Sequence, residues 1–213
     1  MIKAIIFDLD GTLINTLEDL CDSVNHVLAL HGMPLHSLGE IRRFVGNGIG
    51  KLIERSVPES TDKNLVSICT AEMLDWYKDH AKIKTAPYEG VKELIEYLNK
   101  NGIKTAVVTN KAEAAAKALC NEIFGDVFTC VIGDDGKTPL KPAPDNVFRA
   151  LNAVGADRET ALYVGDSEVD MITARNSGLD SIGVLWGFRD EETLKNNGAK
   201  YIVSSPSDIK KLI

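Results

Sequence analysis

The sequence predicts an α/β fold, a doubly wound parallel sheet that is interrupted by a helical insert. Short and almost continuously apolar segments recur along the 213-residue chain, as expected of strands that helices cover on both faces. Segments with apolar residues at helical spacing lie between most of them, and this alternation favours a parallel sheet with right-handed crossovers. One long stretch after the first apolar segment has no strand pattern and is predicted to be helical throughout.

Five apolar segments are the expected strands of the sheet. They cover residues 3–9, 104–108, 127–132, 161–164 and 181–185. Two of the intervening helices show apolar residues at i, i+3, i+4 and i+7 or a close variant, and each stops at a glycine, Gly102 or Gly155. Their apolar residues are Val91, Leu94, Ile95 and Leu98 in the first, and Val147, Phe148, Leu151 and Val154 in the second.

The predicted insert covers residues 16–84, and the two flanking pieces, 1–15 and 85–213, form the predicted core domain. Three helical faces are visible in the insert, and Pro87 marks the return to the core. The faces consist of Leu20, Val24, Val27 and Leu28, of Leu52, Ile53 and Val57, and of Leu65, Ile68, Cys69, Met73, Trp76 and Tyr77.

Composition and charge exclude several classes of protein. Hydrophobic residues make up 44% of the chain, which is too high for a disordered protein, and no apolar run is long enough to span a bilayer. The apolar start lacks the basic residues and cleavage site of a signal peptide, so a cytoplasmic protein is expected. The net charge of −7 argues against a nucleic-acid partner, and any site for an anion must be built locally.

The four cysteines form no close Cys-x-x-Cys pair, and no nearby histidine completes a zinc pattern. They are expected to be small buried apolar residues in a reducing compartment. Their positions are Cys21, Cys69, Cys120 and Cys130.

Two carboxylates close the first predicted strand. Asp8 and Asp10 follow the apolar residues, and Gly11 permits a tight turn that lets backbone N–H groups approach an anion. Carboxylates beside a buried strand are costly unless a cation or hydrogen-bond donors balance them. An ordinary strand end with a polar loop is the alternative interpretation.

Two further segments offer donors for an anion. Thr109 and Asn110 follow the strand predicted over 104–108, and they could either cap the next helix or bind phosphate together with its N–H groups. Lys141 precedes Pro142 near the start of another helix, and the proline restricts Lys141 to an extended conformation that fixes where its amine points. A solvated surface lysine is the alternative for Lys141.

A second pair of carboxylates follows the strand predicted over 161–164. Asp166 lies at the strand end, and Asp170 lies one turn into the next helix, near the same edge. A plain helix N-terminus, which also favours aspartate and serine, is the alternative.

These four segments share one predicted location, because ligands of open α/β sheets bind at the carboxyl ends of the strands. Asp8, Asp10 and Asp166 would supply oxygen ligands to a hard cation, and Thr109 and Lys141 would supply donors to an anion. A site that holds both a cation and an anion suits phosphate chemistry.

In their order along the chain, the four segments resemble the motifs of the haloacid dehalogenase-like phosphatases. The resemblance covers the whole chain and implies a Rossmann-like core with a helical cap inserted between the first and second motifs. The matching residues are Asp8-Leu9-Asp10-Gly11-Thr12, then Thr109, then Lys141, then Gly165-Asp166-Ser167 with Asp170. One departure is Asn15-Thr16, where relatives more often have Asp-Ser.

The resemblance implies a Mg²⁺-dependent reaction in two steps. Asp8 is the implied nucleophile, and Asp10 first protonates the leaving oxygen and then deprotonates water. The implied phosphate-binding residues are Thr109, Asn110 and Lys141. The implied metal ligands are Asp8, Asp166 and the backbone carbonyl of Asp10. Asp170 and Ser167 would lie next to these residues, outside direct contact with the metal and the phosphate. The cap is expected to close over the site and to exclude bulk water.

Within the family, the chain resembles phosphoglycolate phosphatases in residues 44–48, 109–111, 183–188 and 198–203. Discrimination among leaving groups is expected from the cap, at Gly46, Asn47, Gly48 and Lys51, with Arg42 and Arg43 adding positive charge that could meet a substrate carboxylate. Alternatively, these glycines only make a turn and the cations are solvated.

The expected function is hydrolysis of a small phosphorylated metabolite, with 2-phosphoglycolate as the first candidate, by a monomer or homodimer. Pyrophosphatase, sugar-phosphate phosphatase and phosphomutase activities of the same family are alternatives. A dehalogenase would need neither Mg²⁺ nor an acid at the second Asp position, so Asp10 and Asp166 disfavour it. A non-catalytic phosphate-binding regulator is the alternative from a different class.

Overall fold

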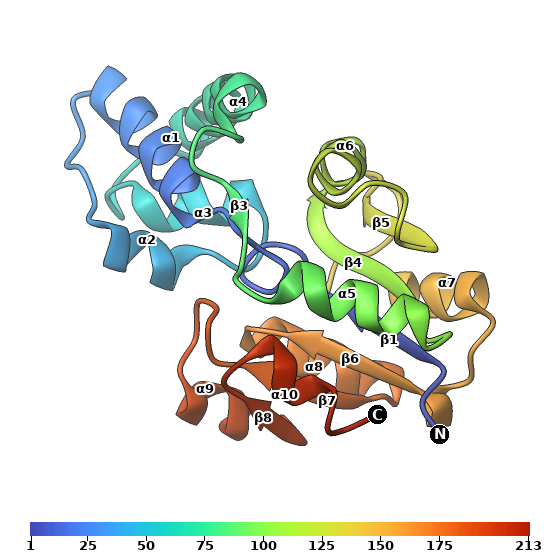
Figure 1. Cartoon of the computed structure of the whole chain (residues 1–213). Helices are drawn as coiled ribbons and strands as arrows, with labels where there is room; N and C mark the ends of the chain where they lie inside the picture. Colours follow the sequence, from blue (N-terminus) through green and yellow to red (C-terminus); the bar gives the residue numbers. More distant parts are fainter. The chain divides into compact units, whose positions relative to one another are not determined.

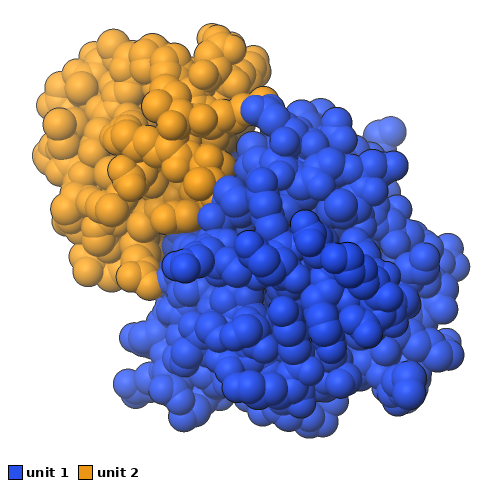
Figure 2. Space-filling view, in the orientation of Figure 1, with its two compact units in different colours: residues 1–14, 87–213 blue, residues 15–86 orange.

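The structure is a computed structural model that describes residues 1–213, and the chain divides into two compact units. Unit 1 consists of Met1–Ile14 and Pro87–Ile213, and unit 2 consists of Asn15–Ala86; Figure 2 colours them separately. The boundaries expected from the sequence, after residues 15 and 84, lie next to these divisions. The chain passes between the units twice, and the two crossings, β2 (Ile14–Asn15) and β3 (Ala86–Pro87), pair as a two-stranded sheet.

Unit 1 is built on a six-stranded sheet in the order β5-β4-β1-β6-β7-β8, in which all neighbours pair in parallel (Figure 1). The predicted fold class is therefore confirmed. The central strand β1 has β4 on one side and β6 on the other, which creates the switch point where ligands of such sheets bind. The strands are β1 (Ala4–Phe7), β4 (Lys104–Ala112), β5 (Cys130–Asp134), β6 (Ala161–Gly165), β7 (Asp180–Val184) and β8 (Tyr201–Val203).

Helices cover both faces of this sheet, because successive side chains of a strand point to opposite faces. Ile5 and Phe7 of β1 lie in one apolar cluster with α5 (Val91–Lys100), α6 (Glu113–Phe124) and α10 (Pro206–Ile209). Ala4 and Ile6 lie in the other cluster, with α7 (Asp145–Val154) and α8 (Glu168–Ser177). The shorter helices η1 (Arg158–Thr160) and α9 (Glu191–Asn196) complete the unit.

Several elements of unit 1 differ from the prediction. Strand β5 begins at Cys130 rather than at residue 127, β4 continues past residue 108 to Ala112, and β8 was not predicted. Phe148, expected on the apolar face of α7, is 37% exposed, and the Arg158 guanidinium lies 4.8 Å from the centre of its ring. The partly exposed Phe148 ring is compatible with this position because the Arg158 guanidinium covers one of its faces.

Unit 2 consists of four helices, α1 (Leu17–Leu30), α2 (Leu38–Phe44), α3 (Ile49–Ser56) and α4 (Lys63–His80). The buried face of α1 holds the four residues predicted for it, whereas α4 buries Cys69, Met73 and Tyr77 and leaves Ile68 exposed. Helix α2 was missed because Ile41 is its only buried residue. No helix of the chain has the length and apolar character needed to cross a membrane.

Both ends of unit 2 are anchored within the unit. The buried Asp19 carboxylate of α1 accepts hydrogen bonds from the backbone N–H groups of Lys84 and Thr85, just before β3. By contrast, the Oγ1 atoms of Thr16 and Thr85 are buried without a hydrogen-bond partner. Unpaired buried hydroxyls cost free energy, and both lie within two residues of a chain crossing.

Candidate active site

Three buried carboxylates from the first and fourth predicted motifs come together in unit 1. Asp8 follows β1, Asp166 follows β6, and Asp170 lies in the first turn of α8. One carboxylate oxygen from each lies within 4.8 Å of the other two. The parallel register of β1 and β6 aligns Phe7 with Val164, which places the two strand ends side by side.

Lys141 is the positive charge of this cluster. Its side chain is buried, and Nζ lies 2.7 Å from Asp8 Oδ1 and 2.8 Å from Asp170 Oδ1. The alternative of a solvated surface lysine is therefore wrong. One ammonium group faces three carboxylates, so the cluster is left with an excess of negative charge if all four groups are ionised.

This excess appears in the proton affinities of the carboxyl groups. Burial, together with the nearby Asp170, raises the pKa of Asp8 well above its usual value although Lys141 opposes the rise. Burial and Asp170 also raise the pKa of Asp166 to about 7. For Lys141, burial disfavours the charge, but Asp170 and Asp8 outweigh burial and raise the pKa. A hard divalent cation would balance this set of oxygen donors, so the residues present fit one.

The two carboxylates of the fourth motif differ in their hydrogen bonding. Asp170 accepts four bonds, from Lys141 Nζ, from the hydroxyl of Tyr163, and from the N–H and hydroxyl of Ser167. Asp166 accepts two, from the Thr12 hydroxyl at 3.1 Å and the Phe188 N–H at 2.7 Å. A carboxylate has about four lone-pair sites. Asp170 is therefore saturated, whereas Asp166 retains capacity for a further partner.

The alternative interpretation of the segment from Asp166 to Asp170, as the N-terminus of a helix, is also correct. Ser167 is the N-cap of α8, and it forms a reciprocal capping box with Asp170. The same contacts that start the helix thus hold the Asp170 carboxylate beside Lys141.

A tight loop after β1 presents Asp10. The carbonyl of Leu9 accepts hydrogen bonds from the N–H groups of residues 12, 13 and 14. Gly11 has φ +93°, and a Cβ there would collide with the Asp166 carboxylate, so glycine is required both for conformation and for space. The Asp10 carboxylate is not part of the three-carboxylate group, and its Oδ1 lies 3.1 Å from Lys111 Nζ.

The second motif differs from the expectation. Strand β4 continues to Ala112 and α6 begins at Glu113, so neither Thr109 nor Asn110 caps the helix. Thr109 is buried, and its hydroxyl accepts a bond from the N–H of Lys111. The side-chain amide of Asn110 bonds both the N–H and the C=O of Lys141, at 2.8 and 3.1 Å. Asn110 thus holds the backbone of Lys141 in place, and its phosphate contact stays a prediction.

Several residues that shape the cluster have no role predicted from the sequence. Thr12 and Phe188 hold Asp166, and Tyr163 holds Asp170. Lys111 contacts Asp10. Thr12 lies inside the first motif, so its role could have been predicted from the sequence. The role of Phe188 could not, because every residue except proline has the same backbone N–H.

The residues predicted to select the substrate lie in unit 2, and that role stays a prediction. Gly46, Asn47 and Gly48 connect α2 to α3, and Lys51 lies in the first turn of α3. The side-chain oxygen of Asn47 accepts a bond from Arg55, and Lys51 forms an exposed ion pair with Glu54 at 2.6 Å.

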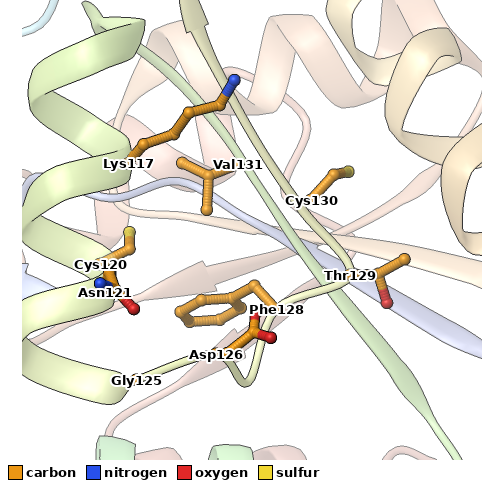
Figure 3. A pocket seen from close by; sticks show the side chains of 9 residues that line it. All are labelled: Lys117, Cys120, Asn121, Gly125, Asp126, Phe128, Thr129, Cys130 and Val131. Carbon is orange, nitrogen blue, oxygen red and sulfur yellow. The ribbon is translucent and has the colours of Figure 1, made fainter.

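A pocket of about 300 Å³ lies elsewhere in unit 1, between α6 and β5 (Figure 3). None of the candidate site residues lines it. Its lining residues are Lys117, Cys120, Asn121, Gly125, Asp126, Phe128, Thr129, Cys130 and Val131. Cys130 is half-buried rather than buried, in contrast to the other three cysteines.

Comparison with known proteins agrees with this arrangement. The model of the haloacid dehalogenase-like hydrolase family matches residues 5–184. The chain belongs to this family. A phosphoglycolate phosphatase of Mesorhizobium japonicum is 36% identical over 87% of this chain and 84% of its own length. Another, from Pseudomonas syringae pv. syringae, is 31% identical over 99% of this chain and 78% of its own length.

Solved structures of this family have the same fold. A crystal structure from Lactobacillus delbrueckii subsp. bulgaricus matches with a TM-score of 0.95 and 32% identity, covering 99% of this chain and 98% of that one. A structure from Haemophilus somnus matches with a TM-score of 0.91 and 27% identity, covering 99% and 97%. Their descriptions call them presumed or predicted phosphoglycolate phosphatases. The resemblance expected from the sequence is confirmed.

Proposed function

We propose that this protein is a cytoplasmic phosphatase that hydrolyses a small phosphate monoester, with 2-phosphoglycolate as the first candidate, through a phosphoryl group carried by Asp8. The observation that carries the proposal is the position of Asp8. Its carboxylate stands at the carboxyl end of the central strand, buried, with Lys141 Nζ at 2.7 Å and two further carboxylates beside it. The names of the relatives support the same activity.

Mg²⁺ is the cofactor that this donor set supports. Asp8, Asp166 and the backbone carbonyl of Asp10 would hold it, since Asp166 retains unused lone pairs while those of Asp170 are occupied. When bound, the cation supplies positive charge between the carboxylate nucleophile and the phosphate.

In the first step, an Asp8 carboxylate oxygen attacks phosphorus in line with the leaving group. The new bond joins that oxygen to phosphorus, and the bond from phosphorus to the leaving oxygen breaks. Asp10 donates its proton to the leaving oxygen, so the alcohol departs neutral. Lys141 and the Thr109 hydroxyl bind the oxygens of the phosphoryl group, and Asn110 holds Lys141 in place through its backbone.

In the second step, water attacks the same phosphorus. Asp10, now a carboxylate, accepts a proton from that water, and the bond between phosphorus and the Asp8 oxygen breaks. Inorganic phosphate leaves and both carboxyl groups return to their starting states. The Lys111 ammonium, 3.1 Å from Asp10 Oδ1, keeps this carboxyl oriented through both proton transfers.

Unit 2 is proposed as a cap that selects the leaving group, with Gly46, Asn47, Gly48 and Lys51 as the selecting residues. The groups of the core that surround the phosphoryl do not distinguish one alcohol from another, so selection needs another surface. The ion pair of Lys51 with Glu54 is exposed, and such pairs are weak enough for a substrate carboxylate to compete.

A panel of phosphorylated metabolites tests the activity. Purified protein with Mg²⁺ is expected to release phosphate from 2-phosphoglycolate faster than from pyrophosphate and sugar phosphates; EDTA should stop the reaction and excess Mg²⁺ should restore it. Acid-quenched samples should contain a phosphorylated peptide that includes Asp8. Turnover without this adduct would exclude the covalent route, and no turnover of any ester would favour the regulatory alternative.

A further inference from the structure

A second group of metal-ligating side chains lies in unit 2. His31 Nε2, Cys69 Sγ and a carboxylate oxygen of Glu72 all lie within 4.8 Å of one another. His31 and Glu72 are already in contact, with 2.6 Å between Nε2 and Oε2, although 41 residues separate them. No pattern in the sequence indicates this group, because the histidine that accompanies Cys69 is brought to it only by folding.

The packing of two helices creates the group. Cys69 and Glu72 are three residues apart on α4, so they share one face of that helix. His31 immediately follows α1, which packs against α4 (Figure 1). The Cys69 side chain is fully buried, whereas those of His31 and Glu72 are partly exposed. An ion could thus enter from the Glu72 side and reach a sulfur that bulk water does not.

The end of α1 favours a positive charge at this position. Unpaired carbonyls give a helix C-terminus partial negative charge, which basic side chains often balance. The last turn of α1 contains no basic residue, and His31 occupies the C-cap position. A cation bound to His31 would supply the missing charge.

We propose that His31, Cys69 and Glu72 form a binding site for Zn²⁺ or a similar late first-row divalent ion, joining the end of α1 to α4. One nitrogen, one sulfur and one carboxylate oxygen form a donor set that suits Zn²⁺ and does not suit Mg²⁺ or Ca²⁺. In a tetrahedral zinc site, neighbouring ligand atoms are about 3.3–3.6 Å apart, so shifts of about 1 Å convert the group into a site. The thiol proton passes to solvent on binding, and water completes the coordination.

Cobalt substitution tests the site independently of enzyme activity. Full-length reduced protein is titrated with Co²⁺, and the near-ultraviolet charge-transfer absorption of a cobalt–thiolate bond is recorded. The titration is expected to produce the band, with an amplitude at saturation that corresponds to one cobalt–thiolate site per chain, and Zn²⁺ is expected to abolish it. The carboxylate cluster of unit 1 offers only oxygen donors besides Lys141, so Co²⁺ bound there gives no sulfur band, and failure of the proposed phosphatase activity would not affect this result.

Variants assign the ligands. Cys69→Ser is expected to abolish the band, and His31→Gln or Glu72→Gln to weaken Co²⁺ binding at least about 10-fold. Cys21→Ser and Cys120→Ser are matched controls that should leave the titration unchanged, and thermal melting verifies that each variant is folded. Because His31 and Glu72 are partly exposed, their variants keep the test valid if Cys69→Ser unfolds. The proposal is overturned by the absence of a band in the wild type, by a band in folded Cys69→Ser, or by unchanged binding in both His31→Gln and Glu72→Gln.

Discussion

At the scale of single residues, the difference between Asp166 and Asp170 lies in what already occupies their oxygens. The four donors on Asp170 and the two on Asp166 explain why one carboxylate positions Lys141 and the other is assigned to the metal. Residue type and burial alone do not distinguish the two, since both are buried aspartates.

Asp8→Asn is expected to abolish turnover, because an amide is a far poorer nucleophile than a carboxylate and a neutral metal ligand. The fold should survive, since the change is nearly isosteric. Steady-state phosphate release and a thermal melt check both points. Substantial activity in freshly prepared variant would contradict the covalent mechanism.

Asp10→Asn should lose roughly 10²–10⁴-fold in rate, the usual contribution of general acid–base catalysis. Mg²⁺ affinity should be kept, because the proposed metal contact of this residue is its backbone carbonyl. Titration calorimetry with Mg²⁺ beside the rate measurement separates the two effects. A variant that loses the metal but keeps its rate at saturating Mg²⁺ would reverse the assignment.

The raised pKa of Asp166 predicts how pH and Mg²⁺ affect stability together. Without metal, the folded state holds this proton up to about pH 7, whereas an ordinary aspartate releases it near 3.8. Its contribution to stability is therefore fully present below about pH 4 and is lost as the pH rises toward 7. Since Mg²⁺ replaces the proton, it should raise the melting temperature more at pH 8 than at pH 5.5. Asp166→Asn should reduce that difference, and Asp8, whose pKa is also raised, accounts for what remains. An equal Mg²⁺ effect at both pH values in the wild type would exclude the linkage.

At the scale of the elements, a buried threonine hydroxyl has a hydrogen-bond partner inside one helix and lacks one at the start of another. Thr16, the N-cap of α1, is fully buried and its hydroxyl has no partner. Thr173 is equally buried inside α8, but its hydroxyl donates to the Val169 carbonyl at 2.7 Å.

Thr16→Val should therefore stabilise the protein by about 1 kcal/mol, because it removes an unsatisfied buried hydroxyl at nearly constant volume. Thr173→Val is the matched control and should destabilise the protein by about 1 kcal/mol, because this substitution removes a hydroxyl that has a hydrogen-bond partner. Urea unfolding of both variants gives the comparison. Equal destabilisation by the two would mean that the Thr16 hydroxyl has a partner, such as bound water.

The elements that the sequence predicted are those whose burial pattern is strong. Strand β1 is buried along its whole length, and β6 likewise, so their apolar runs were sufficient. The three-residue β8 and the helix α2, with one buried residue, carry too little apolar pattern to be recognised. The polar end of β4 was missed because Thr109 and Asn110 resemble cap residues while their neighbours remain in the strand.

In the candidate site, too, some features could be predicted from the sequence and others could not. The carboxylates and Lys141 could be predicted because motif order and strand ends identify them. The bonds between Asn110 and Lys141 could not, because they join residues 31 positions apart through backbone atoms, which a sequence does not distinguish.

At the scale of the whole molecule, the proposed chemistry belongs to unit 1 and the proposed selectivity to unit 2. Lys51→Ala should lower kcat/KM for 2-phosphoglycolate more than for p-nitrophenyl phosphate, which has no carboxylate. Lys78→Ala is the matched control, because Lys78 is also exposed, also in unit 2, and also paired with an acid three residues away. Steady-state kinetics of both variants on both esters decide the matter. Equal losses on the two substrates, or no loss on either, would place selection outside the 46–51 segment.

The pairing of β2 with β3 has a consequence for how such a protein can change over generations. The chain leaves unit 1 and returns to it through two neighbouring strands, so everything between Asn15 and Ala86 is attached through adjacent ends. A segment attached in this way can be lengthened, shortened or exchanged without altering the register of the six-stranded sheet. Proteins that descend from one ancestral core could thereby acquire new substrate specificities by exchanging this one continuous coding segment, while the carboxylates of the core remain unchanged.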